Sequence, residues 1–349
     1  MAQNARLIQT VLTPVYATAL LTGAKSFRWN PLLASPRLNR GGRLHAWRIR
    51  LAERMASRRK AALSRLVDSA HADQIDRDGF AMIANALPAA AFARLSEEVE
   101  TARLPAREMK QGDTVTRFIT LTPEILDGLP GLAGFVRGRL FQGLLRYTAS
   151  LNHDPLVTLH TVLTDPEAGQ PDPQTMFHSD TFHATAKAWF FLRDVAVEDG
   201  PFCYVPGSHR ITSAREEWER AASQAAAAHA NPHHAAGSFR AEATDLDAMG
   251  YPAPEVFAVK ANTLVVADTH GFHARGISHR PSTRLAIYGS LRGNPFAPVT
   301  WADPFRLPGL AGRRGQALDL LRAAAARATG RSEGQPLVGT VRPGDPAIR

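Results

Sequence analysis

The 349-residue sequence predicts a mainly β protein with flanking helices, whose core is a jelly roll of the double-stranded β-helix type. Short apolar and β-branched runs recur through the middle of the chain. A His-x-Asp pair, His178-Ser-Asp180, follows a loop rich in Pro, Gly and Asp, and a second histidine, His273, stands far downstream. Many short strands that carry two histidines and a carboxylate fit the double-stranded β-helix, with helices packed outside it.

The elements are placed by periodicity and by helix start signals. A basic helix is expected over residues 44–70, and a helix over 88–100 because Pro88 suits a first helical turn. Residues 156–163 form a β-branched strand pattern. The remaining strands are expected at 80–84, 186–192 and 256–266, and further helices at 213–228 and 315–328.

Three regions follow from this arrangement. Residues 1–70 form a basic N-terminal extension, and residues 71–300 form the jelly-roll domain. An Ala-rich insertion at 211–250, with a mobile stretch holding several histidines, is expected to cover the active site as a lid. Residues 301–349 are expected to form a helix followed by a flexible polar tail.

The His-x-Asp pair predicts a metal site. Residues two apart on an extended backbone point to the same face, so His178 and Asp180 can converge on one ion, and His273 completes the set. Two imidazoles and one carboxylate occupy one face of an octahedron and leave positions open, which suits non-haem iron(II). Zinc accepts the same ligands.

Arg284 favours iron over zinc. The strand pattern around it puts Arg284, Ala286 and Tyr288 on one face and Leu285 and Ile287 on the other. A guanidinium that points into a barrel needs an anion.

These residues resemble the phytanoyl-CoA dioxygenase-like family of iron(II)/2-oxoglutarate-dependent oxygenases, from about residue 74 to 295. The likeness has five elements in the family's order. They are Asp76-Arg-Asp-Gly79-Phe80, His178-Ser-Asp180, the run from Lys187 to Asp194, the turn from Gly200-Pro201 to Pro206-Gly-Ser-His-Arg210, and His273 followed by Arg284.

The resemblance implies a cupin-like fold, a cofactor and a reaction. His178, Asp180 and His273 would hold Fe(II), and Arg284 would bind the distal carboxylate of 2-oxoglutarate through a bidentate fork. Oxidative decarboxylation with O2 would yield succinate and carbon dioxide while an unactivated C–H bond of a small molecule is hydroxylated. Related halogenases lack the carboxylate ligand, so Asp180 favours hydroxylation.

Other residues near the motifs are weaker candidates. The family spacing favours His273 over His270 as the ligand and leaves His270 beside it. Many members have Gly-Ser after the last ligand, where this chain has Ala274-Arg275. Three substrate contacts are expected: Arg275 in this cationic loop, Arg240 in the lid insertion, and His183 just after the first two ligands. An anionic or lipid-linked substrate would suit the cationic loop.

Composition and charge indicate the cellular compartment and a basic N-terminus. The single cysteine, Cys203, excludes an internal disulfide framework and fits the cytoplasm. Residues 1–60 carry twelve Lys or Arg and only Glu53, whereas the rest of the chain has a small net negative charge. The uncharged run from Leu7 to Leu21 is too short and polar for a membrane span.

The partner of this basic segment is left open. It could bind an anionic membrane surface, on the inner face of the membrane, or pack on the domain. Nucleic acid is disfavoured because no recognition module is present. The alternatives to an enzyme are a metal-binding jelly roll that acts as a sensor without catalysis, and a peripheral membrane scaffold; no obligate protein partner is evident.

Overall fold

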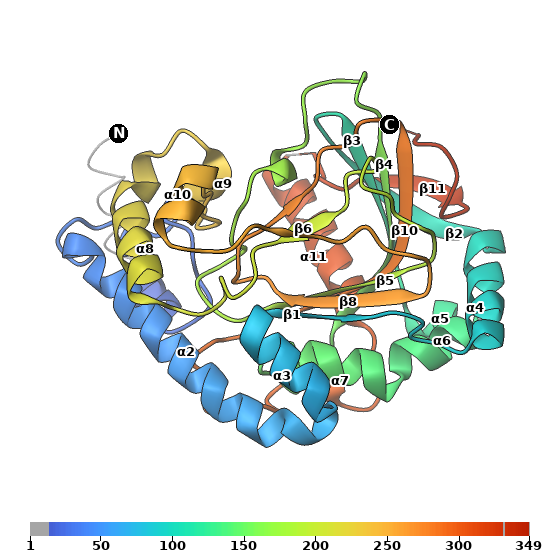
Figure 1. Cartoon of the computed structure of the whole chain (residues 1–349), viewed down its shortest axis with the longest axis horizontal. Helices are drawn as coiled ribbons and strands as arrows, with labels where there is room; N and C mark the ends of the chain where they lie inside the picture. The colour runs from blue at the N-terminus through green and yellow to red at the C-terminus, as the bar shows by residue number, and fades with distance from the viewer. Residues whose placement is uncertain (1–13, 331, 349) are drawn as a thin grey trace.

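The computed structural model describes residues 14–330 and 332–348, and its core is a pair of antiparallel sheets (Figure 1). The larger sheet has eight strands in the order β1-β8-β5-β10-β4-β3-β2-β11, and the smaller has the order β7-β6-β9. The strands are β1 (Phe80–Ile83), β2 (Leu104–Gln111), β3 (Thr114–Thr120), β4 (Leu156–Thr164), β5 (Ala186–Phe191), β6 (Phe202–Tyr204), β7 (Glu255–Val256), β8 (Thr263–Asp268), β9 (His273–Arg275), β10 (Ser282–Leu291) and β11 (Leu337–Val341).

Helices surround this core, as the prediction of flanking helices requires. In Figure 1 the helices α3 and α7 lie below the large sheet, and α2 and α8 lie together to one side. The helices are α2 (Arg43–Leu63), α3 (Ser69–Asp78), α4 (Ala89–Thr101), α5 (Pro123–Asp127), α6 (Pro130–Arg137), α7 (Arg139–Thr148), α8 (Ser213–Ala225), α9 (Pro232–Ala235), α10 (Ala243–Ala248) and α11 (Arg314–Thr329). The mainly β jelly-roll class with outer helices is confirmed.

The two faces of the large sheet have different roles. Leu285 and Ile287 of β10 belong to the main core together with side chains of α4, α6 and α7. On the opposite face, Phe191 and Ala286 meet Phe202 of the small sheet. The alternation predicted for β10 is confirmed, and it leaves the functional residues between the two sheets.

One predicted strand is two strands. The run expected over 256–266 divides into β7 in the small sheet and β8 in the large sheet. Asn262 between them has a positive φ of 65°, a conformation that asparagine tolerates better than most residues. Its side chain accepts from the Leu87 backbone N–H at 2.9 Å, which fixes the turn.

The C-terminal tail contains a strand, so the prediction of a flexible tail from Gly330 is wrong for this stretch. Strand β11 pairs antiparallel with β2 at the edge of the large sheet. After it, backbone carbonyls of the tail accept hydrogen bonds from the buried guanidinium of Arg117. A long-range contact of this kind leaves no periodic pattern in the tail itself.

The described part of the N-terminal extension packs on the domain. Arg48 is 1% exposed and Arg59 is 4% exposed. Arg59 donates to the carbonyls of Ser150, Pro295 and Ala297, which joins α2 to the domain. These contacts favour the packing alternative for residues 14–60, whereas Leu7 to Thr13 of the predicted surface segment lie outside the described residues.

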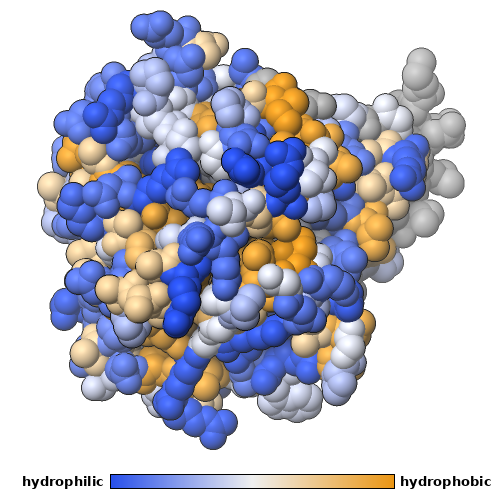
Figure 2. Space-filling view, turned by 90° about the vertical axis from the view of Figure 1, so that its right-hand side faces the viewer, coloured by the Kyte–Doolittle hydropathy of each residue, from blue (hydrophilic) through white to orange (hydrophobic). Residues whose placement is uncertain are grey.

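Within the described residues no helix is both long and apolar enough to cross a membrane. Figure 2 shows the face at the right of Figure 1, where hydrophilic side chains alternate with several separate apolar patches.

Candidate active site

Strand pairing places the two histidines of the predicted metal site opposite each other. His178 and His273 exchange both backbone hydrogen bonds, each at 3.0 Å, and so form a close antiparallel pair. On its other side, the segment of His178 is bonded to the insertion, because the Ser179 N–H donates to the carbonyl of Phe239 at 3.0 Å. The position of His178 is therefore set by β9 and by the insertion together.

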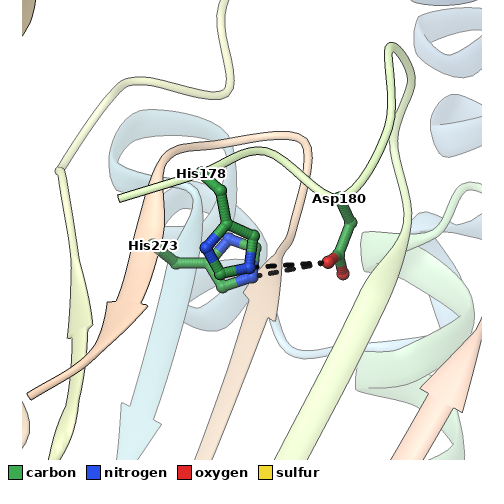
Figure 3. A group of neighbouring side chains, drawn as sticks. All are labelled: His178, Asp180 and His273. Carbon is green, nitrogen blue, oxygen red and sulfur yellow. Dashed lines mark ion pairs between the residues drawn. The ribbon is translucent and has the colours of Figure 1, made fainter. Parts of the chain in front are cut away.

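The three predicted ligands lie together, with ligand atoms within 4.8 Å of one another. The Nε2 atoms of His178 and His273 lie 3.9 Å and 3.7 Å from Oδ1 of Asp180. Figure 3 shows the two rings one over the other, with these nitrogens facing the carboxylate. Neighbouring ligand atoms of one metal ion have this kind of spacing, so the arrangement fits a single ion.

Backbone carbonyls orient both imidazoles. Nδ1 of His178 lies 2.8 Å from the carbonyl oxygen of Met176, and Nδ1 of His273 lies 2.9 Å from that of Gly271. A carbonyl accepts only, so Nδ1 is the donor in each ring and Nε2 keeps its lone pair. Hydrogen bonds of this type fix the tautomer that a metal requires.

Lys187 holds the other oxygen of the carboxylate. Its Nζ lies 2.6 Å from Oδ2 of Asp180, while Oδ1 faces the histidines. The ion pair therefore separates the two oxygens into one that faces the lysine and one that faces the metal position.

The charge states of the cluster suit a metal. Burial, followed by the charge of its partner, lowers the pKa of His178 well below its usual range, and burial lowers that of His273 to about 4. Burial alone would raise the pKa of Asp180, but Lys187 and the two histidines hold it well below its usual range. Neutral imidazoles and an ionised carboxylate are the forms that bind a cation.

A cavity of about 230 Å³ lies between the two sheets and reaches the histidines. It is lined mainly by inward-facing side chains of β3, β4, β5 and β10, with Phe202 of β6 opposite. Among them are His178, Lys187, Trp189, His273, Arg284 and Tyr288.

Arg284 is a buried cation that the described chain does not satisfy. It is 8% exposed, and its Nε and Nη2 atoms have no hydrogen-bond partner among the described residues. Burial, and then the charge of Arg275, lowers the pKa of Arg284 to about 9. Unpaired guanidinium donors are costly to bury, so this cavity wall fits a bound carboxylate.

The other predicted contacts are more dispersed. Arg275 lines the cavity, but its guanidinium is already ion-paired with Asp172 at 2.5 Å. The backbone of Arg240 pairs with that of His178. His183 and His270 are buried outside the ligand cluster, and both line a separate cavity of about 500 Å³.

The sequence interpretation missed residues that only the fold brings to the site. Lys187 and Trp189 lie in a motif quoted for the family, yet no role was assigned to either side chain. Their period-2 spacing on β5 was the available signal, because both then face inward with Phe191. Lys25 comes from the distant extension and donates to the Asp180 carbonyl oxygen, which no local pattern could indicate.

Paired sheets with two histidines and a carboxylate at one end define the class of non-haem metal-dependent jelly-roll oxygenases. Within this class, residues 75–248 match the model of the family described as phytanoyl-CoA dioxygenase (PhyH), and this part of the chain belongs to that family. The resemblance predicted from the motifs is confirmed. The family uses iron(II), 2-oxoglutarate and dioxygen, and the His178, Asp180 and His273 side chains can hold the metal.

Three solved structures illustrate what this chain is similar to. The non-haem α-ketoglutarate-dependent carbocyclase SnoK from nogalamycin biosynthesis is 21% identical, covering 64% of this chain and 83% of its own, with a TM-score of 0.40. HygX from Streptomyces hygroscopicus, with nickel and 2-oxoglutarate bound, is 17% identical over 70% of this chain and 94% of its own, with a TM-score of 0.37. EctD from S. alaskensis, with bound Fe, is 14% identical over 72% of this chain and 85% of its own, with a TM-score of 0.42.

No curated protein sequence matches the chain significantly.

Proposed function

We propose that the protein is an iron(II)/2-oxoglutarate-dependent dioxygenase that hydroxylates an unactivated C–H bond of a small molecule. The observation that carries the proposal is the pairing of two features in one cavity. A three-residue ligand cluster opens into it, and the unpartnered guanidinium of Arg284 lines it.

In this proposal His178, Asp180 and His273 hold the iron and Arg284 binds the far carboxylate of 2-oxoglutarate. When bound, iron and 2-oxoglutarate would react with dioxygen. That reaction would convert the keto acid to succinate and carbon dioxide and would oxidise the C–H bond of the substrate. The protein's residues position and shield this chemistry. Trp189, Phe191 and Phe202 give the cavity apolar walls that exclude water from the reacting centre.

Lys187 has a separate task in this scheme. By holding Oδ2 of Asp180 it leaves Oδ1 to the metal, so the carboxylate binds through one oxygen. Single-oxygen ligation keeps coordination positions free for the keto acid and dioxygen.

Anaerobic titration of iron(II) and then 2-oxoglutarate into the metal-free protein tests this proposal. A chelated keto acid gives a weak visible charge-transfer band, and no substrate is needed to observe it. The band is expected in the wild type, with iron bound but little or no band in Arg284→Ala and with iron affinity lost in Asp180→Ala.

The matched control is Arg137→Ala, which removes an exposed arginine paired with Asp127 at 2.9 Å. It should show the wild-type band. A wild type that binds iron but forms no band, or an Arg284→Ala variant with unchanged 2-oxoglutarate affinity, would contradict the assignment.

The outcome at the C–H bond needs its own measurement, since SnoK is described as a carbocyclase. Once a substrate is found, incorporation of one ¹⁸O atom from ¹⁸O2 into the product would support hydroxylation. A product without added oxygen would exclude it.

A further inference from the structure

Three cationic side chains from three parts of the chain lie at the metal cluster. Lys187 comes from β5 and pairs with the carboxylate, and Lys25 comes from the N-terminal extension and donates to the main-chain carbonyl of Asp180. Arg240 comes from the insertion, and its backbone pairs with that of His178. The sequence interpretation had named Arg240 as a substrate contact, but it had placed the main cationic contact at the Arg275 loop.

The contacts of these cations bring them to the same place. Lys25 and Lys187 contact the main-chain carbonyl and the carboxylate of the same residue, Asp180. The backbone of Arg240 pairs with that of His178, and directly paired residues of neighbouring strands direct their side chains to the same face. The positive charge is therefore gathered at the metal cluster.

The group has too few counter-charges. Among the described residues, the pair between Lys187 and Asp180 is the only ion pair that any of the three cations makes. That single carboxylate is also the proposed metal ligand, so its charge is shared with a divalent cation. Buried or half-buried cations in this situation are stabilised only when an anion joins them.

Arg240 shows the deficit most clearly. It is 6% exposed, and its Nη1 donates to the backbone carbonyl and the hydroxyl of Ser238 at 2.7 Å and 2.6 Å. Its Nε has no hydrogen-bond partner among the described residues. By contrast, Arg275 is already matched by Asp172.

We propose that Lys25, Lys187 and Arg240 bind a phosphate group of the substrate beside the metal cluster, so that the substrate is a phosphorylated small molecule. The inference rests on the proposed oxygenase function, and it names the class of substrate. A tetrahedral dianion can be contacted by several cations from different directions. A planar carboxylate is matched instead by a single guanidinium fork, which Arg284 offers to 2-oxoglutarate.

Anaerobic calorimetric titration of phenyl phosphate and of benzoate into protein loaded with iron(II) and 2-oxoglutarate tests the inference. The two probes share a ring and differ in the anionic group. Phenyl phosphate is expected to bind at least about tenfold more tightly than benzoate. Lys25→Gln and Arg240→Gln should each weaken phenyl phosphate by about tenfold or more, because each removes a charge-assisted contact.

The matched control is Lys260→Gln, which also removes one positive charge. Lys260 is exposed and pairs with Asp194 at 2.7 Å, away from the cluster. Equal binding of the two probes, no binding of phenyl phosphate, or an equal loss in Lys260→Gln would overturn the phosphate site.

The charge-transfer band, recorded in the same samples, separates this inference from the proposed function. A band that persists while phenyl phosphate binds supports both. A band without phenyl phosphate binding leaves the oxygenase proposal standing and rejects the phosphate site. A band that disappears as phenyl phosphate binds shows that the probe displaces 2-oxoglutarate or reaches the iron, and it also rejects the phosphate site.

Discussion

Two arginines on the same large sheet, Arg117 and Arg284, show how differently a buried guanidinium can be used. Arg117 of β3 is 0% exposed, and it pairs with Glu108 on the neighbouring strand at 2.6 Å. Its remaining donors reach carbonyls of the C-terminal tail, including Pro343 at 3.0 Å. Arg284 of β10 is nearly as buried, yet two of its nitrogens have no partner among the described residues.

The difference separates structural from functional buried charge. The chain supplies partners for Arg117 from two distant segments, so this cation ties the tail to the sheet. For Arg284 the chain supplies a cavity instead. Burial of a charge therefore does not distinguish a binding residue from a structural one; the count of satisfied donors does.

The largest effect on folding is expected at Arg117. Arg117→Met would remove the partner of a buried carboxylate and several donors to the tail. Because removing one partner of a buried ion pair is strongly destabilising, the free energy of unfolding should fall by about 3–5 kcal/mol. Urea denaturation measures this loss. A decrease of less than about 1 kcal/mol in the free energy of unfolding would mean that the pair does not anchor the tail.

An intermediate effect is expected at Arg59, whose acceptors are neutral. Arg59→Met would leave the carbonyls of Ser150, Pro295 and Ala297 without their donor. Unsatisfied buried acceptors of this kind cost about 1–3 kcal/mol in total stability. The same denaturation experiment applies, with Arg58→Met on the same helix as the control; equal losses in both variants would argue against a specific contact.

The smallest effect on folding is expected at Arg284. Arg284→Gln removes a charge that has no ion-pair partner among the described residues, so the free energy of unfolding of the metal-free protein should change by less than about 1 kcal/mol or increase. Its 2-oxoglutarate affinity, measured by the charge-transfer titration, should nevertheless fall at least about tenfold. A loss of stability as large as that of Arg117→Met would remove the distinction between the two arginines.

The sequence predicted the parts of the fold that have a simple hydrophobic period. Strand β10 and the site residue Arg284 could be placed because apolar and inward-facing residues alternate around them. Strands β2 and β3 were missed. In β2 the charged residues Arg107, Glu108 and Lys110 interrupt any apolar pattern, and Glu108 is nevertheless buried beside Arg117.

The candidate site divides in the same way. His178, Asp180 and His273 could be proposed from spacing and motif, and the structure brings them together. Lys25 could not be proposed from the sequence, because its place beside Asp180 depends on how the extension folds back over the domain. Tertiary contacts between distant segments leave no local trace, and here they supply much of the charge around the site.

The reciprocal backbone pairing of His178 with His273 affects when the protein can acquire its metal. The two residues are 95 positions apart in the sequence, so their pairing closes a long loop and belongs to the slow, non-local part of folding. An unfolded or nascent chain presents these ligands only singly. Metal capture is therefore expected to follow folding, and the geometry of the finished barrel, more than the order in which ions meet the chain, would determine which ion is retained.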